Sequence, residues 1–190
     1  MSTPFQRYPV ELIDTPVLAN GSRVLVRPVL PQDLDLHRLF FDCLSGVSRL
    51  NRFFSPIPSV PDALLEWLTL VDHNKHVALV AEVLGEQGER IVAEARYVID
   101  EEEEGAEVGI AVADGFRRLG LGTYLLTRLL DAARRARVPL VHGQTLVGNR
   151  AMVRLARKLG FSITADPRDD ALVKVSLRLN AAGTQALQST

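Results

Sequence analysis

Two apolar periods alternate along this chain, and their order predicts a mixed α/β fold. Segments such as His76–Leu84 and Arg90–Ile99 are short, rich in Val, Ile and Ala, and separated by a Gly-containing turn, which is typical of a β-hairpin. Gly120–Arg137 has apolar residues three and four positions apart, as in a helix buried on one side. The predicted strands are 23–29, 76–84, 90–99, 107–113, 139–147, 162–165 and 172–179, and the predicted helices are 31–44, 61–70, 120–137 and 149–159.

The segments outside this pattern set the expected boundaries. Residues 1–21 have several prolines and little periodicity, so we expect an extended arm there. Residues 22–179 form the expected domain, and 180–190 a flexible polar tail. Residues 45–61 are rich in Ser and Pro and predict a loop. Because this loop carries Leu50, Phe53, Phe54, Arg49 and Arg52, it is interpreted either as a lid packed on the core or as a wall of an acceptor site.

Composition narrows the classes of protein to consider. With 190 residues, 47% hydrophobic residues and 24% charged residues, the chain fits one globular domain. A net charge of -1 gives no electrostatic reason to expect nucleic acid or a membrane as partner. The single cysteine, Cys43, excludes an internal disulfide and is predicted to be a buried structural thiol. No signal peptide or membrane span is predicted, so a cytoplasmic location is expected.

The turn Arg117–Gly122 lies between a predicted strand and a predicted helix. Such a turn presents unpaired backbone N–H groups at the positive end of the helix dipole, which favours a bound phosphate or pyrophosphate. It matches neither the P-loop pattern nor the dinucleotide fingerprint.

Local charge supports this interpretation, because the region 107–161 is strongly basic in a nearly neutral chain. Its cations are Arg117, Arg118, Arg128, Arg134, Arg135, Arg137, Arg150, Arg154, Arg157 and Lys158, against Glu107, Asp114 and Asp131. Arg117 and Arg118 lie on the turn itself and are the expected phosphate contacts.

Two linked motifs carry a family resemblance. Arg117-x-x-Gly120-x-Gly122, followed by a strand and by Asn149 with a helix that ends at Gly160-Phe161, resembles the GCN5-related N-acetyltransferase (GNAT) superfamily. The resemblance implies a GNAT fold, with one mixed, mostly antiparallel sheet of about six to seven strands and about four helices. It also implies acetyl-CoA as co-substrate and no metal.

Further segments narrow the resemblance to bacterial protein lysine acetyltransferases. They are 48–55, Val71-Asp72 with 76–81, and Ala106-Glu107. This resemblance implies a primary amine as acceptor, with a protein lysine such as one on an acyl-CoA synthetase as the leading choice. A homodimer is left open.

The resemblance also implies roles for individual residues. Glu107 would be the general base that deprotonates the amine, with Glu94 and Asp72 as second choices. The backbone of Ile110, Ala111 and Val112 would pair with the pantetheine arm. The cofactor's pyrophosphate would lie on Arg117, Arg118, Leu119, Gly120, Leu121, Gly122 and Thr123. Asn149 would cap its helix, contact the cofactor arm, or do both. Many family members have a tyrosine seven residues later as general acid, where this chain has Ala156.

Two alternatives stay open from the residues. The acidic run Asp100–Glu104 is interpreted as a solvated loop, although it could draw a polyamine, in which case the acceptor is a small amine. The second alternative is a catalytically silent module that binds acyl-CoA, and it stays open because the tyrosine is missing. His37, His73, His76 and His142 show no metal-ligand spacing, so no metal is expected.

Overall fold

The computed structural model describes residues 8–85, 88–100, 102 and 105–179. Seven strands form one sheet in the order β1-β2-β3-β4-β5-β7-β6. They are β1 (Leu25–Pro28), β2 (His76–Gly85), β3 (Gly88–Asp100), β4 (Gly105–Val112), β5 (Leu140–Leu146), β6 (Ser162–Asp166) and β7 (Asp169–Arg178). Every neighbouring pair is antiparallel except β4 and β5. The mixed, mostly antiparallel sheet is therefore confirmed.

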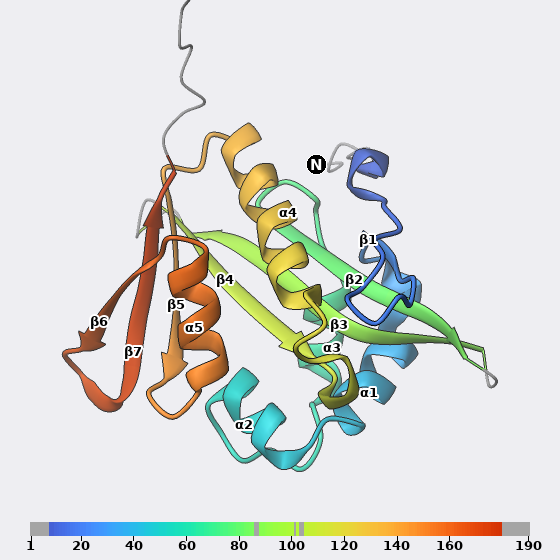
Figure 1. Cartoon of the computed structure of the whole chain (residues 1–190), viewed down its shortest axis with the longest axis horizontal. Coiled ribbons are helices and arrows are strands. Elements are labelled where there is room, and N and C mark those ends of the chain that lie inside the picture. The colour runs from blue at the N-terminus through green and yellow to red at the C-terminus, as the bar shows by residue number, and fades with distance from the viewer. Residues whose placement is uncertain (1–7, 86–87, 101, 103–104, 180–190) are drawn as a thin grey trace, which may run out of the picture.

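Helices cover both faces of this sheet. The α-helices are α1 (Leu34–Asp42), α2 (Gly46–Phe53), α3 (Asp62–Thr69), α4 (Leu121–Arg135) and α5 (Arg150–Lys158), with short 3-10 turns η1 (Val10–Leu12), η2 (Pro31–Asp33) and η3 (Asp114–Phe116). In Figure 1, α4 and α5 lie on the near face, α1 and α3 lie behind the sheet, and α2 lies below the open end between β4 and β5. Among the described residues, no helix has the length and apolar character needed to cross a membrane.

The two faces of the sheet each bury a separate apolar cluster. Helix α4 buries Leu121, Leu125, Leu126 and Leu129 against one face. On the other face, Phe40 and Phe41 of α1 and Leu65 and Leu68 of α3 pack against Ala78 and Val80 of β2. This burial is the main favourable contribution to the free energy of folding.

The prediction of a loop over 45–61 is wrong, because α2 lies within it. Ser45 caps this helix by accepting a hydrogen bond of 3.3 Å from the Ser48 N–H, and Phe54 ends it in the left-handed conformation. Several of its polar side chains face inward, so its apolar period is weak. The helix is the fifth, where about four were expected.

The prediction of a buried Cys43 is also wrong, since its thiol is exposed. Cys43 is the C-cap of α1, and the face of the chain that packs inward there presents Phe40, Phe41 and Leu44 instead. A residue at a helix end follows the turn of the chain rather than the helical period.

The described part of the N-terminal segment packs on the domain. Leu12 and Leu18 are buried in the α4-side cluster, the Tyr124 hydroxyl donates to Asp14, and the Ala19 N–H donates to the Leu119 carbonyl at 3.1 Å. Residues 1–7 and the predicted tail 180–190 lie outside the described residues. So does most of the acidic run, of which Asp100 and Glu102 are described.

One feature of the sheet positions the candidate site. Strands β4 and β5 are paired at only two positions, Ala106 with Val141 and Glu107 with His142. After Glu107 the strands diverge, as Figure 1 shows, and the backbone of β4 that faces β5 has no ladder partner there among the described residues. An unpaired strand edge of this kind can accept an extended ligand as an added strand.

Candidate active site

A cavity of about 720 Å³ opens where β4 and β5 diverge, and it joins Glu107 to the turn before α4. Its walls come from β3, β4, β5, α2, α3, α4 and α5. The polar residues that line it are Ser48, Asn51, Arg52, Arg96, Glu107, Arg117, Arg118, Thr123, Gln144, Thr145, Asn149, Arg154 and Lys158. Segments that lie far apart in the sequence therefore share one wall.

Glu107 lies at the point of divergence. It is directly opposite Val98 of β3 and His142 of β5, and its side chain is exposed in the cavity wall. Because side chains alternate along a strand, Glu107 shares one sheet face with Gly109 and Ala111. This is the face that α1 and α3 cover.

The next residues of β4 continue the cavity wall. Ile110, Ala111 and Val112 all line it, while the side chains of Ile110 and Val112 pack into the α4-side cluster. Their backbone groups lie beyond the last β4–β5 pair. The predicted pantetheine-binding strand thus has the exposed backbone that this role requires.

The predicted phosphate turn has a strained backbone. Arg118 has φ +62° and Gly120 has φ +90°, both in the left-handed region. Only glycine adopts that region without a steric cost, so Gly120 suits its position and Arg118 is under strain.

The turn leads directly into the cavity wall at the start of α4. Arg117, Arg118, Gly120, Gly122 and Thr123 line the cavity. Leu119 and Leu121 instead pack into the core, so that they could contribute only through their backbone. The N–H groups of the first turn of α4 are free of helical partners and carry the positive end of its dipole.

The Arg117 side chain has protein partners of its own. Its guanidinium lies 2.9 Å from Asp114 Oδ1 and donates to Ser48 Oγ at 2.7 Å. Burial alone would raise the pKa of Asp114, but hydrogen bonds from Ser45 and Ser48 and the charge of Arg117 lower it. Arg118 is therefore the freer of the two expected phosphate contacts.

Asn149 acts as the cap of α5, because its Oδ1 accepts a hydrogen bond of 3.2 Å from the Met152 N–H. It also lines the cavity. Ala156, the position of the usual tyrosine, is fully buried in the core and does not line the cavity.

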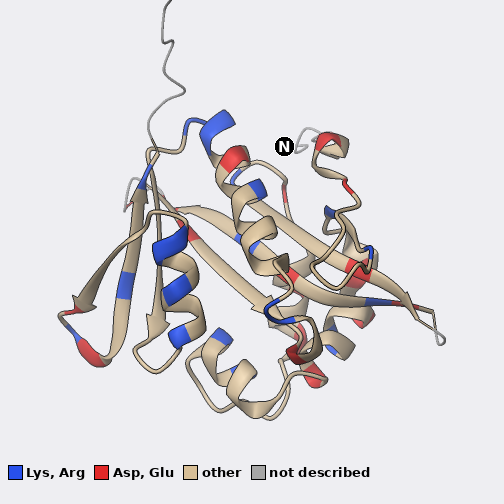
Figure 2. Cartoon of the chain, viewed as in Figure 1, with Lys and Arg blue, Asp and Glu red and all other residues tan. Residues whose placement is uncertain are grey.

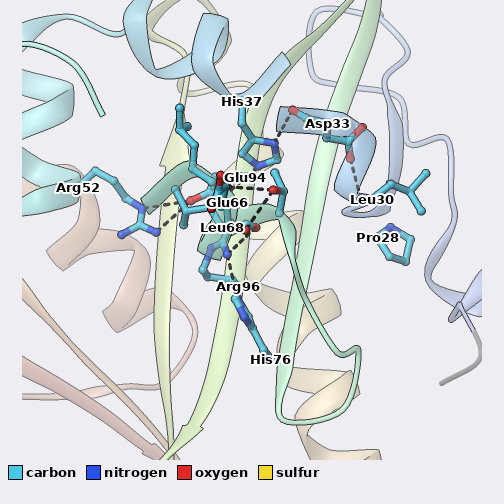
Figure 3. A network of polar contacts seen from close by, with 12 residues as sticks. Pro28, Leu30, Asp33, His37, Arg52, Glu66, Leu68, His76, Glu94 and Arg96 are labelled. Carbon is cyan, nitrogen blue, oxygen red and sulfur yellow. Dashed lines mark hydrogen bonds and ion pairs between the residues drawn. The ribbon is translucent and has the colours of Figure 1, made fainter. Parts of the chain in front are cut away.

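Figure 3 shows a buried ionic network, whose strand residues Glu94 and Arg96 lie opposite Ala111 and Gly109 of β4, on the same sheet face as Glu107. Glu94 of β3 is fully buried and accepts hydrogen bonds from Arg96 and from Arg52 Nε and Nη2, the latter at 3.2 and 3.0 Å. His37 Nε2 lies 3.5 Å from Glu94 Oε2. Burial alone would raise the pKa of Glu94, but Arg96 and Arg52 hold it well below its ordinary value.

The far end of this network is held by aromatic and backbone groups. Arg96 Nη1 donates to the Leu68 carbonyl at 2.9 Å and lies 2.8 Å from His76 Nε2, while Trp67 stacks on His76. Burial and the Arg96 charge lower the pKa of His76 to about 4. His76 is thus neutral near pH 7 and accepts the Arg96 hydrogen bond.

The two second-choice bases, Glu94 and Asp72, both have hydrogen-bond partners within the protein. Glu94 is an ionised partner of two guanidinium groups. Asp72 accepts backbone hydrogen bonds of 2.8 Å from Asn74 and His76. Burial alone would raise the pKa of Asp72, but these bonds lower it. Asp72 also lies outside the residues that line the cavity. Of these three carboxylates, Glu107 is the one that lines the cavity.

Sequence reasoning missed several residues of the cavity wall. Asn51, Trp67, Arg96 and Thr145 all line it. Thr145 is 1% exposed, and its hydroxyl has no hydrogen-bond partner among the described residues. The alternation of β3 could have placed Arg96 on the same face as Glu94, but nothing local in the sequence brings Trp67 or Asn51 to this strand.

Positive charge continues along α5, as the blue side of that helix in Figure 2 shows. Arg150, Arg154 and Lys158 recur every four residues and so share one side of the helix. Arg154 and Lys158 also line the cavity. In the part of the chain that the structure describes, no group of three His, Cys, Asp or Glu side chains is placed to hold a metal ion.

The sequence is similar to those of known acetyltransferases. The chain is 36% identical to an acetyltransferase of Pseudomonas aeruginosa, over 82% of this chain and 84% of that protein. It is 30% identical to Acetyltransferase Pat of Mycolicibacterium smegmatis over 82% of this chain, a match that spans 46% of the relative.

Solved structures of acetyltransferases share the fold of this chain. The GNAT domain of S. lividans PAT superposes with a TM-score of 0.82 at 24% identity, over 91% of this chain and 100% of that one. YncA of Salmonella typhimurium, solved with its cofactor acetyl-CoA, has a TM-score of 0.64 at 21% identity, over 88% of this chain and 99% of that one. The Acetyltransferase (GNAT) family matches residues 36–161, and the chain belongs to this family of acetyltransferases.

Proposed function

We propose that this acetyltransferase moves the acetyl group of acetyl-CoA to the side-chain amine of a protein lysine, with Glu107 as general base. The observation that carries the proposal is the position of Glu107, an exposed carboxylate at the point where β4 and β5 diverge, within one cavity with the turn before α4. A lysine amine is protonated near pH 7 and must lose a proton before it attacks.

The proposed reaction assigns each step to a group. Glu107 accepts a proton from the ammonium, directly or through water. The neutral amine then attacks the thioester carbonyl carbon, a C–N bond forms, the C–S bond breaks, and the CoA thiolate leaves with the electron pair. The nitrogen releases its second proton to solvent as the amide forms. A backbone N–H of β4 near Val112 would polarise the carbonyl oxygen. With Ala156 buried, we assign no general acid, and the thiolate leaves unprotonated or takes its proton from solvent.

The residues fit acetyl-CoA as donor. The cavity of about 720 Å³ has an exposed strand edge for the pantetheine amides and, beyond it, the free N–H groups of α4 with Arg118 beside them for the pyrophosphate. YncA has this fold and binds acetyl-CoA.

The names of two relatives and the open rim of the cavity support a protein as the acceptor. The Mycolicibacterium smegmatis and S. lividans relatives carry the name Pat, and the resemblance of the sequence to protein lysine acetyltransferases points the same way. At the acceptor end of the cavity, Phe54 and Trp67 are 40% and 47% exposed, and an open rim with aromatic groups suits a macromolecule. A cytoplasmic location stays a prediction.

The test combines one variant with two measurements. Glu107→Gln keeps the size of the side chain and removes the base, so we expect acetyl transfer to a lysine peptide to fall about 100-fold or more. Titration calorimetry with acetyl-CoA should give an unchanged Kd. Glu89→Gln is the matched control, because Glu89 is an exposed residue of β3 outside the cavity, and it should retain full transfer.

Other results would change the proposal in defined ways. Unchanged transfer by Glu107→Gln would remove Glu107 from the mechanism. Transfer to polyamines but to no peptide or protein would replace the acceptor. Binding of acetyl-CoA without transfer to any amine would leave a silent module.

A further inference from the structure

The proposed function gives no role to the guanidinium of Arg52, which lines the cavity. It lies against the backbone of β4, since a Cβ on Gly109 would come within 3.3 Å of Arg52 Cζ. A Cβ there would push the guanidinium aside by a few tenths of an ångström. Gly109 lies two residues after Glu107 on the same face of the strand. Arg52 is thus fixed about 7 Å along β4 from the proposed base.

One edge of this guanidinium remains available. Arg52 Nε and Nη2 both donate to Glu94 Oε1, whereas Nη1 makes no hydrogen bond to any described residue. The side chain is 16% exposed and lines the cavity. Arg96 differs, because Leu68 and His76 take its Nη1, Glu94 takes its Nη2, and its Nε, which has no partner among the described residues, is buried. Arg52 is therefore the guanidinium of this network that has N–H groups to offer a ligand (Figure 3).

Charge gives a second reason to expect an anion there. The guanidinium groups of Arg52 and Arg96 share a single carboxylate, that of Glu94. The nearby Arg27 has two carboxylate partners, Asp33 and Glu82. A carboxylate on the acceptor would pair with the free edge of Arg52.

We propose that the acceptor presents a carboxylate to Arg52 and that, in a protein, this is an Asp or Glu two residues from the modified lysine. In an extended segment, side chains two residues apart lie on one side about 7 Å apart, which equals the spacing of Glu107 and Gly109 along β4. An acid directly next to the lysine points to the opposite side. The inference rests on the proposed function, because it places the lysine at Glu107.

Four short acetyl-capped, amidated peptides test this, and the other three each differ from the first at one or two positions. One has Lys-Ala-Glu, the second has Lys-Ala-Gln, the third has Lys-Glu-Ala, and the fourth reverses the first as Glu-Ala-Lys. We expect kcat/KM for Lys-Ala-Glu or Glu-Ala-Lys to exceed that for Lys-Ala-Gln by on the order of tenfold. Lys-Glu-Ala should resemble Lys-Ala-Gln. Equal values for Lys-Ala-Glu, Glu-Ala-Lys and Lys-Ala-Gln would overturn the inference, and this result needs no variant.

Variants then assign the preference to Arg52. Arg52→Gln should reduce the ratio of kcat/KM for Lys-Ala-Glu to that for Lys-Ala-Gln to about one. Arg52→Lys, which keeps the charge but lacks the paired N–H groups of a guanidinium, should retain part of this ratio. Arg134→Gln is the matched control, because Arg134 lies on α4 outside the cavity and pairs with Asp131. A ratio that persists in Arg52→Gln would overturn the assignment.

A small-molecule pair separates this inference from the proposed function. 6-Aminohexanoate has an amine and a carboxylate, and hexylamine lacks the carboxylate. If no peptide is acetylated and 6-aminohexanoate is preferred to hexylamine, the protein acceptor is wrong, and so is the flanking acid. If all peptides are acetylated equally and Glu107→Gln abolishes transfer, the proposed function stands and the inference fails.

Discussion

The Arg117 guanidinium donates a hydrogen bond of 2.7 Å to Ser48 Oγ, which joins the turn before α4 to α2 across 69 positions of the chain. Ser48 in turn donates to Asp114 Oδ1 at 2.8 Å. Arg52, on the same helix as Ser48, pairs with Glu94 of β3. Helix α2 is thus tied at one point to the proposed cofactor turn and at another to the network beside the proposed base.

Removal of the Ser48 hydroxyl should disturb both ends of this link. In Ser48→Ala the Arg117–Asp114 pair persists, but its connection to α2 is reduced to the Ser45 hydrogen bonds to Asp114. We therefore expect about 1 kcal/mol less stability and a Kd for acetyl-CoA about fivefold higher. Denaturant unfolding and calorimetry would measure the two effects. Thr127→Val also removes a bonded hydroxyl, but on the outer side of α4, and should leave the Kd unchanged. An unchanged Kd in Ser48→Ala would show that the link does not position the turn.

Helix α2 is also the helix that the sequence did not predict. The strands and α4 follow from local apolar periods, and the Arg117–Gly122 turn follows from its glycines. Helix α2 has no such period, since Ser48 and Arg52 face inward to partners that lie 66 and 42 positions away. Long-range polar contacts stabilise this helix, and a local pattern does not contain them. The same holds for Glu94, which the sequence offered as a base and the fold buries as an ion-pair partner.

The backbone of Gly120 provides the second prediction. Its φ of +90° lies in a region that an alanine adopts only with strain, so Gly120→Ala should lose about 1–2 kcal/mol of stability and weaken acetyl-CoA binding. Gly115→Ala is the control in the neighbouring turn, because Gly115 has no positive φ and its added Cβ would meet no atom within 4 Å. Equal unfolding free energies for the two variants would contradict this account.

Asn149 distinguishes helix capping from cofactor contact. Its Oδ1 is engaged with the Met152 N–H, so the structure favours the capping role. We expect Asn149→Ala to lose about 1 kcal/mol of stability, and Asn149→Ser, which keeps a capping oxygen, to lose little. If Asn149→Ser is stable but binds acetyl-CoA several-fold more weakly by calorimetry, the amide also contacts the cofactor.

The buried network makes stability depend on pH. The pKa of His76 falls from 6.5 to about 4 on folding, so the unfolded chain binds more protons between these values and stability falls as the pH falls. From pH 7 to pH 5 the expected loss from His76 is about 2 kcal/mol. Glu94, with its lowered pKa, contributes in the same direction only near and below its ordinary value of 4.5. Unfolding curves of His76→Gln should be flatter over pH 5–7, and an identical slope would exclude His76 as the cause.

Thr145 offers the sharpest test of what occupies the cavity. It is 1% exposed, as is Thr69, but the two hydroxyl groups differ in their partners. Thr69 donates to the Leu65 carbonyl at 3.0 Å, whereas the Thr145 hydroxyl has no partner among the described residues and lines the cavity beside the diverging strands. A buried hydroxyl without a partner costs about 1–3 kcal/mol, so a valine of the same shape should be neutral or stabilising.

The two threonines should therefore respond in opposite ways. Thr69→Val should lose about 1 kcal/mol of stability and bind acetyl-CoA normally, because it removes a hydrogen bond that is already made. Thr145→Val should keep or gain stability while its Kd for acetyl-CoA rises about fivefold, since the ligand would lose the hydroxyl as a partner. Thermal unfolding and calorimetry on the same samples separate the effects. A Thr145→Val protein that binds acetyl-CoA as the wild type does would mean that the bound ligand does not reach β5.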